Sequence, residues 1–99
     1  VIGGIKVTEP AADLGIALAI VSSFKDLSPK ESTIVIGEIG LSGELRRVQN
    51  ISKRIDEAQK MGFSKAIIPN LQSKEIQNSE IKVIGVSNLK EAINIYFSN

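Results

Sequence analysis

The stretch from Thr8 to Phe24, T-E-P-A-A-D-L-G-I-A-L-A-I-V-S-S-F, constrains the fold more than any other part of the sequence. Its centre, residues 14–21, is apolar or glycine at every position, so a helix there has no polar face. Pro10 suits a first helical turn, where its missing N–H leaves no hydrogen bond unmade, and Thr8 is placed to cap that turn. We therefore expect a helix that ends at about residue 24 or 25 and has most of its surface covered by the rest of the fold.

Composition removes several classes of chemistry before any motif is considered. The chain contains no cysteine and no histidine, which excludes disulfides, thiolate nucleophiles, imidazole bases and the usual zinc ligand sets within it. A catalytic site would have to use Ser, Thr, Lys, Asp, Glu or Tyr. The 99 residues, 42% hydrophobic and 23% charged, fit one soluble globular domain. Because the net charge is only +1, any claim of nucleic-acid binding must rest on a local patch.

Two further features bear on location and completeness. No apolar run approaches the roughly 20 residues that span a bilayer, and no basic segment precedes a cleavage-like site. We therefore expect a cytoplasmic location and no membrane partner. The first residue is not Met, and Val1–Gly4 reads like the interior of a strand, so we expect residues 1–99 to be one domain of a longer protein.

Apolar runs, separated by residues that favour turns, predict an alternation of strands and helices. The runs that predict strands are Val1–Val7, Thr33–Ile39, Glu44–Val48, Phe63–Pro69 and Ile81–Val86. The clearest is Thr33–Ile39, a continuous run of the kind buried on both faces of a sheet. The glycine-rich turn Gly40–Gly43 favours a hairpin into the next strand. The element order β-α-β-β-α-β-β-α indicates a compact, layered α/β (α+β) domain.

A second helix follows from its cap and its spacing. Asn50 is placed to cap it and Gly62 to end it. The apolar residues that share one face of this helix are Ile51, Ile55, Ala58 and Met61. We therefore expect these side chains to enter the core together.

The C-terminal quarter predicts one more helix after a polar loop. Residues 70–80 are polar and irregular, with one helical turn expected around Lys74–Gln77. Asn88 precedes Glu91 by three residues, close to a capping box, and opens a helix that runs to about Phe97. The apolar face of that helix consists of Ile93, Tyr96 and Phe97. Because the two aromatic residues sit at helical spacing with an isoleucine, we interpret them as core residues and not as base-stacking groups.

Several segments, taken in their order along the sequence, resemble a known family. The segments are Gly3–Leu14 (G-G-I-K-V-T-E-P-A-A-D-L), Gly37–Val48 (G-E-I-G-L-S-G-E-L-R-R-V), Gly62–Phe63, Ala66–Pro69 and Val83–Val86. Together they resemble the C-terminal domain of the bacterial DNA-repair protein family RadA, also called Sms, from Val1 to about Ala92. That domain is in turn similar to the proteolytic domain of Lon proteases, in the ribosomal-protein-domain-2-like superfamily. The resemblance implies the same fold here, without the upstream strands, zinc finger and ATPase of the longer protein.

The resemblance also implies that the protease chemistry has been lost. A Lon-type protease uses a Ser nucleophile in a Pro-Ser-Ala-Gly motif and a Lys base in a Gly-Gly-Leu-Lys pattern. The matching residues are Pro10–Asp13 (P-A-A-D) and Gln49–Ser52 (Q-N-I-S), which place Ala11 and Ser52 at the two catalytic positions. A relocated dyad that uses Lys53 is the alternative, but one step along a helix turns a side chain by about 100°. We therefore expect no catalytic residues.

A cluster of cations is the candidate DNA-binding site. Its members are Arg46, Arg47, Lys53 and Arg54. Such a patch can contact phosphates with a salt-dependent gain in affinity, or it can be an ordinary solvated surface. The resemblance favours contact, because RadA-type proteins act on recombining DNA as hexameric rings. It implies two kinds of partner, further copies of the protein in the ring and DNA, both single- and double-stranded.

No motif in the chain points to a cofactor or a metal. The carboxylates near the helix start and the hairpin are Glu9, Asp13, Glu38 and Glu44, and their spacing does not indicate convergence. Acidic residues near a helix N-terminus are favoured by its dipole, which explains Asp13. The pattern Gly37-x-x-Gly40-x-x-Gly43 lacks the Lys-Ser/Thr of a phosphate loop. The resemblance implies ATP, Mg and Zn only for other domains, a central RecA-like ATPase and an N-terminal zinc finger.

These observations lead to one functional prediction with two alternatives. We predict a non-proteolytic Lon-like scaffold domain that serves ring assembly and DNA contact in homologous recombination and branch migration. The alternatives are an active Ser-Lys peptidase with a relocated dyad and an oligomerisation module that does not bind DNA.

Overall fold

The computed structural model of the chain describes residues 9–26, 32–77 and 79–98. In order, the elements are the 3-10 turn η1 (Pro10–Ala12), α1 (Asp13–Lys25), β1 (Thr33–Val35), β2 (Glu38–Ile39), β3 (Leu45–Arg46), α2 (Ile51–Lys60), β4 (Lys65–Pro69), the 3-10 helix η2 (Asn70–Glu75), β5 (Lys82–Val86) and α3 (Leu89–Tyr96). The predicted α/β class is confirmed. The predicted strand Val1–Val7 and the proposed cap at Thr8 lie outside the described residues.

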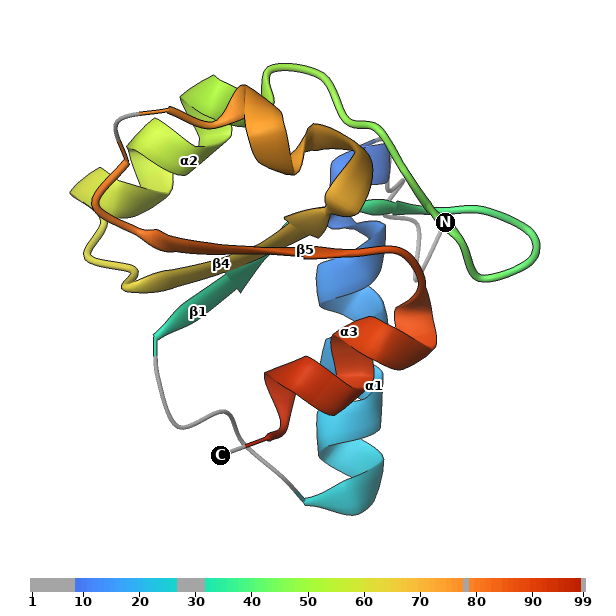
Figure 1. The fold of residues 1–99 in the computed structure, drawn as a ribbon. Coiled ribbons are helices and arrows are strands. Elements are labelled where there is room, and N and C mark those ends of the chain that lie inside the picture. The colour runs from blue at the N-terminus through green and yellow to red at the C-terminus, as the bar shows by residue number, and fades with distance from the viewer. Residues whose placement is uncertain (1–8, 27–31, 78, 99) are drawn as a thin grey trace.

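The centre of the fold is a parallel sheet of three strands in the order β1-β4-β5. Ala66 of β4 pairs with Ile34 of β1 on one side and with Val83 of β5 on the other. In Figure 1, α2 and η2 lie above this sheet, and α1 and α3 lie below it. The layers follow from the apolar run in β4, whose residues are buried on both faces.

Two hydrophobic clusters fill the two faces of the sheet. Ala66 and Ile68 of β4 pack with the buried face of α2, whereas Ile67, between them in sequence, packs with α1 and α3. This division follows from the strand period of two, which sends successive side chains to opposite faces. Tyr96, at the end of α3, and Phe97, its C-cap, pack against the second cluster as predicted, in an edge-to-face contact at 4.9 Å between ring centroids.

The predicted strand Thr33–Ile39 is two strands that belong to different sheets. β1 pairs with β4, whereas β2 pairs antiparallel with β3, Glu38 opposite Arg46. The chain leaves the parallel sheet at Gly37, because the Gly37 N–H donates to the carbonyl of Ala11 at 3.0 Å and not to β4. The prediction of one continuous strand was therefore wrong, although the hairpin that follows it was predicted correctly.

The apolar helix forms where expected but is less covered than predicted. α1 ends at Lys25, and Asp26 follows in the left-handed conformation with φ of 52°. Leu14 and Leu18 are buried, whereas a stripe along the other side of the helix is exposed among the described residues. Its large members are Ile16, Ile20 and Phe24, with 40%, 55% and 87% of their surface accessible. The sheet and α3 contact only one side of α1, which leaves this stripe unpartnered within the described part of the chain.

The boundaries of α2 explain a second correction. Ile51, Ile55 and Ala58 are buried as predicted, but Met61 is 75% exposed. The helix ends at Lys60, and Met61 is its C-cap, directly before Gly62 turns the chain with φ of 93°. Asn50 occupies the N-cap position in the left-handed conformation, without a capping hydrogen bond from its side chain.

The C-terminal elements are close to those predicted. The helical turn expected around Lys74–Gln77 is instead the 3-10 helix η2, which begins directly after β4. The Asn88 side chain accepts a hydrogen bond from the Glu91 N–H at 2.8 Å, which confirms the cap of α3. The Glu91 carboxylate accepts one from the Ser87 N–H at 3.3 Å. None of the helices in the described ranges is long and apolar enough to cross a membrane.

Candidate functional site

The position predicted for a protease nucleophile lies at the start of the apolar helix. Ala11 belongs to η1 and is 6% exposed. Its backbone is held from two directions, since its N–H donates to Oε1 of Glu9 at 3.3 Å and its carbonyl accepts from Gly37. A methyl group at this position can neither attack a carbonyl nor exchange a proton.

Ala11 faces a cavity of about 410 Å³ with a polar wall. The described residues that line it are Glu9, Pro10, Ala11, Glu38, Arg47, Val48, Gln49 and Arg54. Within the described part of the chain, neither a serine nor a lysine contributes to this lining. Among the described residues, the cavity therefore brings together two carboxylates and two guanidinium groups, a set suited to charge recognition.

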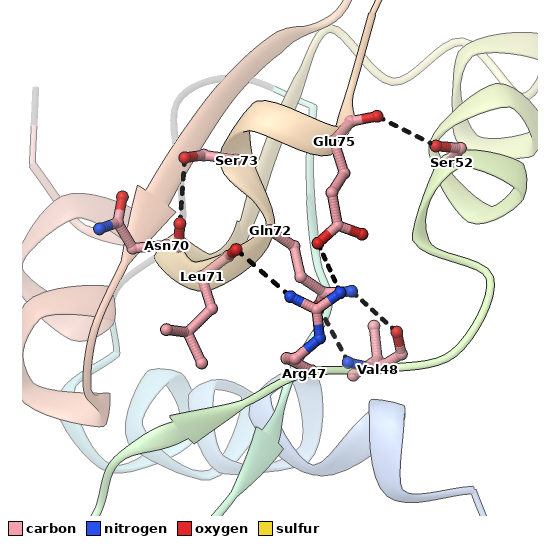
Figure 2. A network of polar contacts seen from close by, with 8 residues as sticks. All are labelled: Arg47, Val48, Ser52, Asn70, Leu71, Gln72, Ser73 and Glu75. Atoms are coloured by element: carbon pink, nitrogen blue, oxygen red, sulfur yellow. Dashed lines mark hydrogen bonds and ion pairs between the residues drawn. The ribbon is translucent and has the colours of Figure 1, made fainter.

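The position predicted for the base lies elsewhere. Ser52 is an exposed residue of the first turn of α2, and its hydroxyl donates to the backbone carbonyl of Glu75 at 3.4 Å (Figure 2). Lys53, the residue of the relocated-dyad alternative, is also exposed on α2. Neither residue lines the cavity next to Ala11 in the described structure.

The four candidate DNA-binding cations come from β3, the connection after it, and α2. Arg47 and Arg54 meet at the cavity, whereas Arg46 and Lys53 do not line it. Each arginine forms an ion pair. Arg46 pairs with Glu44 at 3.4 Å, Arg47 with Glu75 at 2.6 Å, and Arg54 with Glu9 at 2.9 Å. The sequence prediction located the cations but missed the carboxylates that accompany two of them.

Arg54 is the most enclosed of these arginines. Its side chain is 31% exposed, and its Nε donates to the carbonyl of Gln49 at 2.8 Å in addition to the ion pair with Glu9. The same Glu9 oxygen accepts from the Ala11 N–H. Arg54 therefore links the start of α2 to η1, across 45 positions of sequence from Glu9.

Gln72 is a structural residue beside the candidate site that the sequence prediction missed. It is 1% exposed, and its side-chain amide makes two hydrogen bonds with the backbone of Val48 (Figure 2). Its Oε1 accepts from the Val48 N–H and its Nε2 donates to the Val48 carbonyl, both at 2.9 Å. We call this pair of bonds the Gln72 clasp. It fixes the connection between β3 and α2, which carries Arg47, onto η2.

The close packing of η2 against β5 requires a glycine in the sheet. A Cβ atom added to Gly85 of β5 would lie 2.9 Å from the Cα of Asn70. No side chain fits in this gap, so the η2 backbone can approach β5 only at a glycine. The hydroxyl of Ser73 donates to the Asn70 carbonyl at 3.0 Å and stabilises the turn (Figure 2).

The remaining acidic candidates have separate local roles. Asp13 accepts from the Ile39 N–H at 3.1 Å and so connects α1 to β2. The Glu44 carboxylate accepts hydrogen bonds from the backbone N–H of Glu44 itself and from that of Ser42. These bonds hold the pKa of the Glu44 carboxyl below its ordinary value, and Arg46 lowers it further. In the described ranges no group of three or more acidic side chains is arranged to hold a metal ion.

Comparison with known proteins places these observations in a family context. The family described as subunit ChlI of Mg-chelatase has a sequence model that matches residues 3–72. DNA repair protein RadA of Halalkalibacterium halodurans is 50% identical over 97 residues, covering 96% of this chain and 21% of the relative. RadA of Bacillus subtilis is 48% identical, covering 94% of the chain and 20% of the relative, and RadA of Aquifex aeolicus is 44% identical, covering 98% and 21%. The chain thus spans about a fifth of the length of these relatives.

Proposed function

The chain belongs to the family described as subunit ChlI of Mg-chelatase and matches one segment of DNA repair protein RadA, and on that premise we propose that it is a non-proteolytic scaffold domain of a RadA/Sms-type protein. Its proposed roles are DNA contact and ring assembly during homologous recombination and branch migration. Identity of 44–50% over nearly the whole chain to proteins named RadA carries the proposal. The zinc finger and ATPase implied by the resemblance belong to other segments of such a protein.

The absence of proteolysis is supported by the surroundings of Ala11 and Ser52. A nucleophile and its base must lie within hydrogen-bond reach. Here one position holds a methyl group beside a charged cavity, and the hydroxyl of the other faces a backbone carbonyl. The domain keeps the position of the protease site but lacks its reactive groups.

A peptidase assay tests this part of the proposal. We expect the purified chain to leave an unfolded protein substrate intact, at the rate of a buffer control. The variants Ser52→Ala and Lys53→Ala should behave like the wild type. Cleavage by the wild type that either substitution abolishes would establish the relocated dyad and overturn the proposal.

Of the four candidate cations, Arg46, Arg47 and Lys53 are the ones for which DNA contact is proposed. Arg46 and Lys53 are exposed, and Arg47 is 57% exposed, so phosphates can approach all three. Neutralising phosphates releases condensed counterions, which makes each contact favourable at low salt. Arg54 is better placed to hold the fold than to reach DNA, because its guanidinium is largely enclosed by Glu9 and Gln49.

Charge reversal on the proposed surface tests the contact. The double variant Arg46→Glu, Lys53→Glu should bind a labelled duplex more weakly than the wild type, measured by fluorescence anisotropy. Lys82→Glu and Lys90→Glu together make the matched control, because these lysines belong to other elements, β5 and α3. An equal loss of DNA affinity in the two double variants would mean that only net charge matters, and it would contradict a specific DNA-binding surface.

Ring assembly is supported by the exposed apolar stripe on α1. Contiguous exposed apolar surface commonly marks an interaction site. Ile20, at the middle of the stripe, is 55% exposed, so Ile20→Lys should lower the oligomer mass measured by light scattering, with Asn94→Lys of α3 as the control. A wild type that is monomeric at every concentration would remove assembly from the functions of this chain.

A further inference from the structure

The ion pair between Arg47 and Glu75 is built differently from the other two. Its charged atoms are close, at 2.6 Å, yet both side chains reach solvent, with 57% of Arg47 and 39% of Glu75 accessible. The guanidinium also donates to the Leu71 carbonyl, but that bond is long, 3.5 Å from Nη1 to the oxygen (Figure 2). The guanidinium is therefore held mainly by one exposed carboxylate.

The backbone that carries Arg47 is fixed independently of this ion pair. The Gln72 clasp holds the next residue, Val48, by two bonds of 2.9 Å. The hydroxyl of Ser52 adds a third link to η2, through the carbonyl of Glu75 and not its carboxylate. Because these links do not involve the Glu75 carboxylate, Arg47 can exchange its partner without movement of the chain that carries it.

The other two arginines lack this combination. Arg54 is enclosed and has a second strong bond, so its ion pair belongs to the fold. The Arg46 guanidinium lies 3.4 Å from the Glu44 carboxylate, which already accepts a hydrogen bond from the Ser42 N–H at 2.9 Å. The Arg46 side chain is therefore only weakly held. Arg47 is thus the arginine whose availability one exposed carboxylate controls.

We propose that the Glu75 carboxylate occupies the Arg47 guanidinium in the place of a DNA phosphate, so that DNA binding requires displacement of Glu75. A carboxylate and a phosphate are recognised by the same fork of guanidinium N–H groups, which makes the two competitors for one site. Glu75 is then an intramolecular competitor that keeps the affinity of the domain for nucleic acid low. This inference rests on the proposed DNA contact and adds its regulation.

The size of the effect follows from the exposure of the pair. Exposed ion pairs contribute little, so removing Glu75 should raise DNA affinity by no more than about fivefold. Because DNA displaces Glu75 from Arg47 in the wild type as well, both chains make the same phosphate contacts, and the slope of log K against log salt concentration should stay the same.

The test compares Glu75→Gln with a matched charge change in the full 99-residue chain. Glu80→Gln removes the same charge from a residue whose bonds are to Gln59 and not to an arginine. Binding of a fluorescein-labelled duplex is measured between about 50 and 200 mM salt, the range over which phosphate contacts are resolved. We expect Glu75→Gln to bind more tightly than the wild type at each salt concentration, with an unchanged slope, and Glu80→Gln to stay close to the wild type.

A double variant isolates the contribution of Arg47. If the tighter binding of Glu75→Gln comes from the freed guanidinium, it should vanish in Arg47→Ala, Glu75→Gln measured against Arg47→Ala alone. Tighter binding that persists without Arg47, or an equal increase for Glu75→Gln and Glu80→Gln, would overturn the inference and leave DNA contact standing. No binding by the wild type or by Glu75→Gln at any salt concentration would instead overturn the proposed DNA contact, and the inference with it.

Discussion

Replacing Gln72 by leucine tests the most distinctive structural feature of the chain. Leucine is close to glutamine in size and apolar, so Gln72→Leu keeps the buried volume and removes only the clasp. The substitution leaves the Val48 N–H and carbonyl without the two partners that they have at 2.9 Å. Any loss of stability then reports on these two hydrogen bonds.

The expected loss follows from the burial of the groups involved. A buried backbone group left without a partner costs about 1–3 kcal/mol. Gln72 is 1% exposed, whereas Val48 is only partly buried, so water can reach its backbone in the variant and the lower half of this range applies. We expect a total decrease in the free energy of unfolding of about 2–4 kcal/mol for the two groups. In a domain of this size that lowers Tm by about 10 °C or more.

Urea unfolding followed by far-ultraviolet circular dichroism measures this change, since the chain has no tryptophan to serve as a fluorescent probe. The control is Gln77→Leu, an exposed glutamine just after η2, which should unfold within about 0.5 kcal/mol of the wild type. If Gln72→Leu also unfolds within about 0.5 kcal/mol of the wild type, the clasp does not stabilise the fold and the reasoning fails.

A second substitution at the same residue gives a pH signature. In Gln72→Glu the ionised side chain can still accept from the Val48 N–H, but it faces the Val48 carbonyl without a donor. Burial and this carbonyl raise the pKa of the introduced carboxyl, because both disfavour the charged form. A raised pKa in the folded state means that stability is greatest below the unfolded-state value and is lost as pH rises. Gln72→Glu should therefore approach wild-type stability on acidification.

Three further predictions concern the cap, the hairpin and the helix face. Asn88→Ala should destabilise the fold by about 1 kcal/mol in the same urea assay, because the Glu91 N–H loses its cap. The pKa of Glu44 is lowered in the folded state, so the ionised carboxylate stabilises the fold when the pH is above the ordinary pKa of Glu. This contribution is lost as the pH falls through the folded-state pKa, so the wild type and Glu44→Gln should converge in stability at low pH. Ile55→Ala should cost about 2–5 kcal/mol, whereas Met61→Ala should change stability by less than about 0.5 kcal/mol, because only the isoleucine is buried.

Helices were predictable here because their signals are local. The spacing of Ile51, Ile55 and Ala58 and the cap at Asn88 depend on residues within one or two turns of each other. The division of residues 33–39 into two strands was not predictable, because β1 and β2 lie in one apolar run and are distinguished by their partners. An apolar run indicates that a segment is an extended, buried strand, but it does not indicate which sheet the strand joins.

The sequence named the residues of the candidate site but not the partners that their side chains pair with in the structure. The resemblance located Ala11 and Ser52, and the run of positive charges located the cations of β3 and α2. The partners of the arginines come from remote segments, as the 45 positions between Glu9 and Arg54 illustrate, and no spacing rule relates them. Gln72 lay in a loop expected to be polar and irregular, and one glutamine among several polar residues carries no sign that it will be buried.

The salt dependence of DNA binding by the wild-type chain tests the central claim most directly. A scaffold that contacts DNA through Arg46, Arg47 and Lys53 should bind a labelled duplex with an affinity that falls linearly in a plot of log K against log salt concentration. Three phosphate contacts correspond to a slope of about −2.7. Binding that does not change with salt, or no binding at low salt, would contradict the claim that this domain contacts DNA.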